Sequence, residues 1–181
     1  LSPKENHTNK LFVRNELKKI FYNKTKNLEK NLNSLFDKDL KVNCFHPINE
    51  FESLENLKSK FYEPLFKAFP DIERRELMVV GGAFRDKIQV GSISILSGIF
   101  KNPWLGVNPN FKMINLRCCE IHEIKNGKII ESHILIDTLD FIRQLGIWPI
   151  NISRGSEGSW HGPYNTDGLD FYEEDSNVSK N

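Results

Sequence analysis

The hydrophobic pattern of this 181-residue chain changes its period at about residue 73. Before that point apolar side chains recur at three- and four-residue steps, which predicts amphipathic helices. From Arg74 onward apolar and polar side chains alternate in runs rich in Val, Ile and Phe, which predicts β-strands. Helices followed by consecutive antiparallel strands are typical of an α+β fold.

The helical half of the chain divides into three segments. Residues 9–36 predict one long helix or two consecutive helices that break near residues 23–27, and residues 40–48 predict a short strand. Ser53 is a candidate N-cap for the next helix, and Pro64 is expected to break or restart that helix because it lacks a backbone donor. The sheet half begins after this helix.

The sheet half ends in a hairpin and a final helix. Residues 76–100 predict two or three antiparallel strands, and residues 111–124 predict another. Asn126-Gly127 is a favoured dipeptide for a tight hairpin turn, after which residues 128–137 return as a strand. A helix follows and ends at Gly146, a candidate C-cap.

The composition excludes several classes of protein. Lys plus Arg is 25 and Asp plus Glu is 24, so no charge excess indicates a nucleic-acid or anionic-membrane partner. No apolar run is long enough to span a bilayer, and we expect no secretory signal. The three cysteines lack zinc-site spacing, and Cys118 and Cys119 are neighbours whose side chains point to opposite faces of a strand. We expect inert thiols, no metal, no cofactor and a cytoplasmic protein.

The domain organisation follows from these patterns. Residues 1–8 are polar and are expected to be disordered, and residues 9–150 form one domain. Residues 151–181 are rich in Gly, Ser, Asn and acidic side chains, which predicts a tail or linker.

Several short motifs follow one another in a distinctive order. His46-Pro47 precedes the second helical segment, which contains PLFKAFPD, and a strand ends in GIFKNPWLG. The turn KNGK, the pattern E-x-H-x-x-x-D at residues 131–137 and the sequence RQLG complete the series. Over residues 10–149 the chain resembles the SnoaL-like polyketide cyclases, or ester cyclases, of the NTF2-like superfamily.

This resemblance implies a fold and a site. It implies an NTF2-like cone in which N-terminal helices pack on a strongly curved, mainly antiparallel sheet around a deep pocket, and it implies a homodimer. In the characterised cyclases an aspartate at the end of this strand is the general acid/base, without metal or cofactor, and the matching residue is Asp137. A histidine on the neighbouring strand is also implicated, and His122 is the nearest candidate.

The strand before Asp137 suggests how such a carboxylate could act. Alternation puts Glu131, His133, Leu135 and Asp137 on one face. If that face lines the hollow, desolvation raises the pKa of the carboxyl group toward the range useful for proton transfer. The alternative is that Asp137 is the N-cap of the last helix, and the two roles are compatible. His133 is either a polar pocket residue or a hydrogen-bonded core histidine.

The preceding strand offers a second set of polar residues. His122 and Glu120 share one face, whereas Arg117 and Glu123 share the other, where they could form a structural ion pair. The aromatic residues either line the pocket or belong to the ordinary hydrophobic core. His46 lies either at the pocket mouth or in a structural turn. The predicted pocket-lining residues are His46, Phe61, Tyr62, Phe84, Trp104, Glu120 and Leu135.

The function predicted from these residues is binding of a small, partly apolar carbonyl compound. Cofactor-independent acid/base chemistry, such as aldol cyclisation or isomerisation, is expected with Asp137 as acid/base and His133 or His122 assisting. One alternative is a non-catalytic ligand-binding or dimerisation module. Another is a hydrolase or dehydratase that uses the same pocket.

Overall fold

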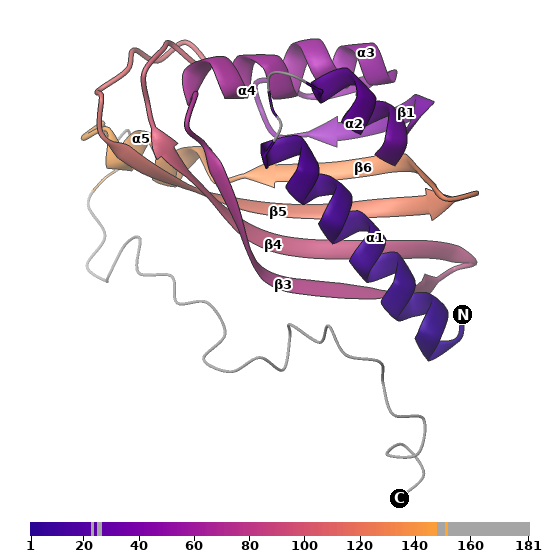
Figure 1. Cartoon of the computed structure of the whole chain (residues 1–181). Coiled ribbons are helices and arrows are strands. Elements are labelled where there is room, and N and C mark those ends of the chain that lie inside the picture. The colour runs from indigo at the N-terminus through magenta and orange to yellow at the C-terminus, as the bar shows by residue number, and fades with distance from the viewer. Residues whose placement is uncertain (23, 25–26, 148–150, 152–181) are drawn as a thin grey trace, which may run out of the picture.

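The computed structural model describes residues 1–22, 24, 27–147 and 151, in which helices cover one face of a six-stranded curved sheet (Figure 1). The strand order is β2-β1-β6-β5-β4-β3, with β1 and β6 parallel and all other neighbours antiparallel. The predicted α+β class with a mainly antiparallel sheet is confirmed. The strands are β1 (Phe36–Cys44), β2 (Glu50–Glu52), β3 (Glu73–Phe84), β4 (Lys87–Ile99), β5 (Met113–Lys125) and β6 (Lys128–Ile136). The helices are α1 (Pro3–Tyr22), α2 (Leu28–Leu35), α3 (Leu54–Leu57), the π-helical turn η1 (Lys58–Tyr62), α4 (Glu63–Ala68) and α5 (Thr138–Gln144).

Helix α1 begins at Pro3, whereas residues 1–8 were expected to be disordered. The reason is a reciprocal cap: the Glu5 carboxylate accepts from the Ser2 backbone N–H at 2.8 Å, and the Ser2 hydroxyl accepts from the Glu5 N–H at 3.2 Å. The Asn6 amide donates to the Gly81 carbonyl at 2.9 Å and ties this first turn to β3. The predicted break after α1 is confirmed, because α1 ends at Tyr22 and α2 begins at Leu28.

The segment from Leu54 to Ala68 is helical throughout, and α4 begins at Glu63 with Pro64 in its first turn, so the predicted restart of the helix at Pro64 is confirmed. The Ser53 hydroxyl accepts from the Asn56 N–H at 3.3 Å, which confirms the predicted N-cap. Proline has no N–H to donate, and its ring crowds the carbonyl four residues earlier. The π-helical turn η1 lies immediately before α4 and absorbs this misfit without ending the helix.

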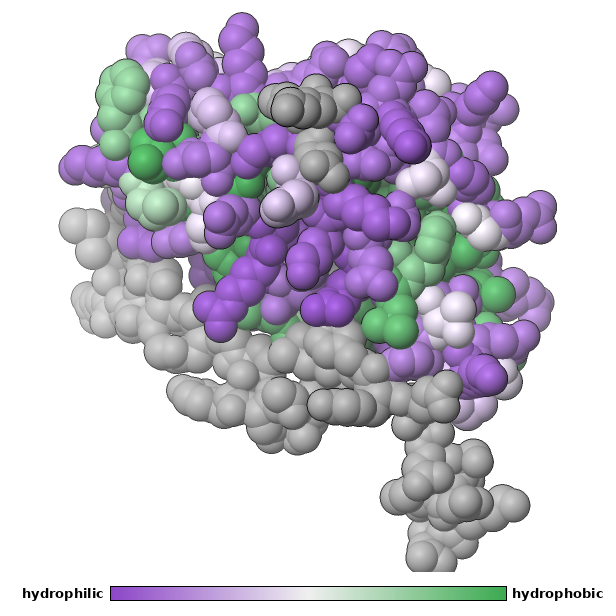
Figure 2. Space-filling view, viewed as in Figure 1, coloured by the Kyte–Doolittle hydropathy of each residue, from purple (hydrophilic) through white to green (hydrophobic). Residues whose placement is uncertain are grey.

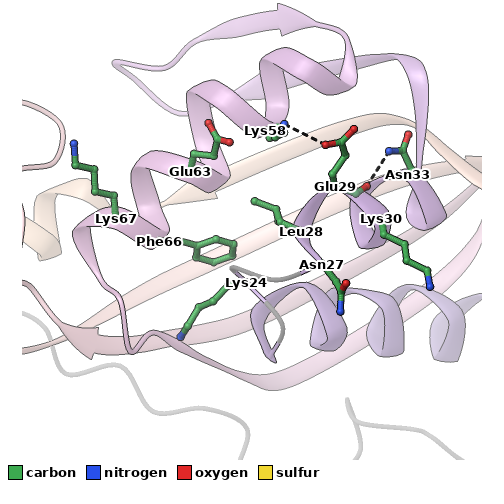
Figure 3. A pocket seen from close by; sticks show the side chains of 10 residues that line it. All are labelled: Lys24, Asn27, Leu28, Glu29, Lys30, Asn33, Lys58, Glu63, Phe66 and Lys67. Carbon is green, nitrogen blue, oxygen red and sulfur yellow. Dashed lines mark hydrogen bonds and ion pairs between the residues drawn. The ribbon is translucent and has the colours of Figure 1, made fainter.

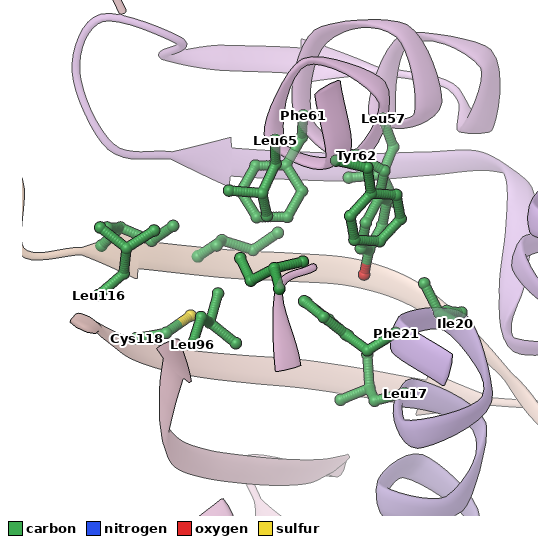
Figure 4. Close-up of a cluster of buried hydrophobic side chains, with 14 of the residues drawn as sticks. Leu17, Ile20, Phe21, Leu57, Phe61, Tyr62, Leu65, Leu96, Leu116 and Cys118 are labelled. Atoms are coloured by element: carbon green, nitrogen blue, oxygen red, sulfur yellow. The ribbon is translucent and has the colours of Figure 1, made fainter. Parts of the chain in front are cut away.

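Alternation along the long strands separates a buried inner face from a solvent-exposed outer face. Cys118 is buried and Cys119 is exposed, which confirms that these neighbours point to opposite faces. The β5–β6 hairpin turns at Asn126-Gly127, both with positive φ, as predicted. Figure 4 shows how side chains of α1, η1 and α4 meet those of β4 and β5 in the core, including Phe21, Tyr62 and Leu116.

The helix-covered side of the molecule is mostly hydrophilic in Figure 2, so the amphipathic helices expose their polar faces. No helix among the described residues is long and apolar enough to cross a membrane. The predicted tail at residues 151–181 lies outside the described residues, apart from Asn151.

Candidate functional site

The inner face of the sheet carries buried charged side chains beneath the helices. Arg74 on β3 places Nη2 2.6 Å from Oε2 of Glu120 on β5, and both side chains are almost fully buried. Arg74 Nη2 also donates to the Ser92 hydroxyl at 2.9 Å, and Nε donates to Glu76 at 3.0 Å. We name the inner polar cluster as Arg74, Glu76, Ser92, Glu120, His122 and Ser132.

His122 extends this cluster toward β6. Its Nδ1 lies 3.0 Å from the Ser132 hydroxyl, which faces it across the β5–β6 pair. The edge of the imidazole meets the Phe36 ring, with centroids 6.3 Å apart. The ring is therefore held in one orientation by one polar and one aromatic neighbour.

Four buried polar atoms near this cluster have no hydrogen-bond partner within the described residues. They are Arg74 Nη1, Tyr62 Oη, Ser94 Oγ and His122 Nε2. Buried polar atoms in folded proteins are almost always paired, since an unpaired one loses its hydration without compensation. These four atoms can therefore bind a polar group of a ligand or water. In Figure 4 the Tyr62 hydroxyl points away from its own helix, toward the sheet.

Burial sets the charge states of the cluster. It lowers the pKa of His122 to about 4 despite the nearby Glu120 carboxylate, so the imidazole is neutral at pH 7. Burial would raise the pKa of Glu120, but Arg74, His122 and the Ser92 hydroxyl outweigh it, and the pKa lies below its usual value. Burial also raises the pKa of Tyr62 well above its usual value, so its hydroxyl remains a donor.

A surface groove of about 310 Å³ borders the cluster at Arg74, the one cluster residue that lines it. It lies between the end of α1 and the start of β3, and Phe21, Lys24 and Arg74 are among its lining residues. Arg74 also stacks on the Phe21 ring at 5.7 Å from the centroid. Arg74 lies at the inner side of this groove, since its side chain is almost fully buried.

Asp137 lies at the other face of the sheet. Its Oδ1 accepts from the Asp140 N–H at 2.8 Å and its Oδ2 accepts from Arg117 at 2.7 Å. The first bond confirms the predicted N-cap of α5. The side chain is 38% exposed, so Asp137 lacks the enclosed apolar surroundings that its predicted acid/base role required.

His133 and Leu135 accompany Asp137 on the outer face, and both are exposed. His133 Nε2 lies 3.3 Å from the Glu131 carboxylate. Leu135, Asp137 and Arg117 help to line a shallow groove of about 270 Å³. His122 and Glu120 face the opposite side, so the structure separates the predicted residues into two groups.

The ion pair predicted between Arg117 and Glu123 is wrong. Arg117 binds Asp137, whereas Glu123 binds Lys87 at 2.6 Å. Six residues along one strand span about 20 Å, which is beyond the reach of two side chains.

The remaining predicted pocket residues fall into two groups. Phe61, Tyr62 and Trp104 are buried in the interior. Phe84 is 60% exposed because it ends β3 beside the tight β3–β4 turn. His46 is exposed in the turn after β1, with Nδ1 3.3 Å from Asn49 Oδ1, so neither Phe84 nor His46 reaches the inner polar cluster.

Arg74, Glu76 and Ser92 were missed by the sequence argument. The signal available was a charged pair at alternate positions, Arg74 and Glu76, at the start of a strand. Its meaning depended on Glu120 facing Arg74 across β4, which the sequence alone does not specify.

No group of three or more His, Cys, Asp or Glu side chains among the described residues could hold a metal ion.

A family model of SnoaL-like polyketide cyclases matches residues 19–145. This chain belongs to the SnoaL-like polyketide cyclase family. The match spans the last turn of α1, the helices from α2 to α4, all six strands and α5, so it includes both the inner polar cluster and Asp137. A comparison with curated protein sequences gave no significant match.

Solved structures of this family share the fold. A protein from Jannaschia sp. CCS1 assigned as a SnoaL-like polyketide cyclase superposes with a TM-score of 0.65 at 19% identity, covering 78% of this chain and 94% of that one. IdmH from Streptomyces antibioticus, assigned as a polyketide cyclase, gives 0.62 at 15% identity, covering 81% and 100%. AclR from Streptomyces galilaeus, assigned as a hydroxylase, gives 0.57 at 20% identity, covering 74% and 93%. At these identities the likeness establishes the fold of this SnoaL-like protein.

Proposed function

We propose that this SnoaL-like protein binds a small, partly apolar carbonyl compound between the helices and the inner face of the sheet. The observation that carries the proposal is the set of buried polar atoms without partners, Tyr62 Oη and His122 Nε2 above all, within an aromatic interior. A ligand carbonyl is the group that two neutral donors would hold. The surrounding aromatic rings favour an apolar or aromatic body.

We further propose cofactor-independent acid/base chemistry at this position. Tyr62 and His122 would donate to the carbonyl oxygen, with the Ser132 hydroxyl donating to His122 Nδ1 so that Nε2 carries the proton. Arg74 and Ser92 both bond to Oε2 of Glu120, which leaves Oε1 to take a proton from the carbon beside the carbonyl. The resulting enolate could attack a second carbonyl, and the proton would return to the new alkoxide.

A Tyr62→Phe variant tests the binding proposal. It removes the unpartnered hydroxyl and keeps the ring that packs on Phe61 and Phe66. We expect the free protein to gain about 1 kcal/mol of stability, because a buried hydroxyl without a partner is removed. Ketones and β-diketones selected by thermal shift should bind about five- to tenfold more weakly to the variant. Unchanged stability together with unchanged binding would contradict the proposal.

Paired variants separate the two candidate acid/base residues. Glu120→Gln removes the proposed base in the interior, and Asp137→Asn removes the carboxylate predicted from the family resemblance. If Glu120 is the base, Glu120→Gln abolishes turnover of a bound ketone while Asp137→Asn keeps it. The reverse result supports Asp137, and the family chemistry would then use the outer groove. Turnover in neither the wild type nor the variants, with binding intact, favours the alternative of a non-catalytic ligand-binding module.

We also propose a homodimer formed through the outer face of the sheet. Exposed apolar side chains from three strands gather there, including Val80, Ile121 and Leu135, which are 51%, 43% and 61% exposed. Single exposed apolar residues are common on protein surfaces, whereas a group of them on one face is typical of an interaction site. Light scattering should give a dimer mass for the wild type and a monomer mass for Ile121→Glu/Leu135→Glu.

The three unpaired cysteines are the observation behind our proposal of a cytoplasmic location.

A further inference from the structure

A second cleft opens between α2 and α4, on the helix-covered side of the molecule (Figure 3). Its volume is about 800 Å³, which lies within the range of small-molecule binding sites. It takes in the start of α2 and one side of the helix that runs from η1 into α4. Neither the resemblance nor the inner polar cluster accounts for this cleft.

The floor of the cleft is apolar. Leu28 and Phe66 form it, and both are more than nine-tenths buried. On its inner side the Phe66 ring packs against Phe21 and Tyr62, with centroids 5.4 and 5.7 Å apart. The cleft is therefore separated from the inner polar cluster by a layer of aromatic rings.

The rim of the cleft is basic. Four lysines line it against two glutamates, and the lysines come from separate segments of the chain: Lys24, Lys30, Lys58 and Lys67. Of these, Lys58 is held 3.7 Å from Glu29. Lys30 and Lys67 are exposed, and their ammonium groups make no hydrogen bond or ion pair within the described residues. Positive charge at the rim is thus only partly neutralised.

We propose that this cleft is a binding site for an organic anion with an apolar or aromatic body. The body would lie on Phe66 and Leu28, and the anionic group would lie at the rim within reach of Lys30 or Lys67. In Figure 3 the two ammonium groups lie at opposite ends of the cleft, outside the floor. A molecule whose body covers the floor can therefore place its anionic group near either lysine. A bare inorganic anion would gain nothing from the apolar floor.

Two dyes of nearly the same shape test this assignment. 8-Anilinonaphthalene-1-sulfonate carries a sulfonate, and N-phenyl-1-naphthylamine has the same ring system without it. Fluorescence titration of the full chain should give one site for the sulfonate dye, with weaker binding at higher salt. The charge-reversed variant Lys30→Glu/Lys67→Glu should weaken binding of the sulfonate dye by about tenfold, on the order of threefold for each lysine. Binding of the neutral dye should be unchanged.

A matched control keeps the test specific to the cleft. Lys101→Glu/Lys112→Glu makes the same charge change at two exposed lysines outside the cleft. Equal weakening in the control would mean that only net charge matters, and no weakening in either variant would mean that the dye binds elsewhere; both results overturn the proposal. Glu63→Lys adds a positive charge at the rim and should tighten binding of the sulfonate dye. Thermal melts of each variant show whether its fold is intact.

Discussion

His122 should make the stability of this protein depend on pH in a defined window. In the folded protein the imidazole is fully buried and its pKa is lowered to about 4, whereas its ordinary value is 6.5. Between these two values the unfolded chain binds a proton that the folded protein does not. Stability therefore falls as the pH drops from 6.5 toward 4, and the full loss corresponds to about 3 kcal/mol at about 1.4 kcal/mol per pKa unit.

The measurement compares urea unfolding at pH 7.5 and pH 5.0 for the wild type and His122→Asn. About 2 kcal/mol of the His122 effect falls in this interval, above the range in which most carboxyl groups titrate. Asparagine can keep a polar atom near Ser132 but cannot take up a proton, so the variant should lose about 2 kcal/mol less than the wild type. The cavity it creates lowers stability at both pH values equally and leaves the difference intact.

His133→Asn is the matched control, because it removes a histidine that is half exposed on the outer face. We expect its loss of stability between the two pH values to follow the wild type. If His122→Asn and the wild type lost equal stability, the imidazole would not be neutral and buried, and the donor role proposed for His122 would fail with it.

Three further predictions concern single features of the fold. Arg74→Met should lower the free energy of unfolding by about 3–5 kcal/mol because Glu120 is left buried without its partner, and Arg74→Met/Glu120→Met should recover part of that loss in urea titrations. In the native protein a thiol reagent such as dithiobis-nitrobenzoate should modify Cys119 before Cys118, because burial raises the pKa of both thiols but only Cys119 is exposed, and Cys118 should react only on unfolding. Gly146→Ala should lower the melting temperature by a few degrees, a cost of about 1 kcal/mol, because residue 146 has φ +80° after α5.

The sequence alone determined most of the elements and their order, although it did not predict the short strand β2, and it placed β1 at residues 40–48 instead of Phe36–Cys44. The change from helical spacing to alternation predicted the α+β class, and local signals identified the Ser53 cap, the Asn126-Gly127 turn and the Asp137 cap. Each of these rests on contacts within a few residues, so a short window of sequence contains the necessary information. The misjudged start of α1 also has a local cause, the Ser2–Glu5 cap that starts this helix early.

Only the tertiary structure decided which polar residues meet. Alternation correctly grouped His122 with Glu120 and His133 with Asp137, but it could not say which face of each strand the helices cover. That choice depends on packing between segments far apart in the chain, and it buried the first pair and left the second exposed. The partner of Glu120 is Arg74, 46 positions earlier on a strand that is not its neighbour in the sheet. Periodicity carries no information about such a pairing, since strand order and register arise only when the whole sheet assembles.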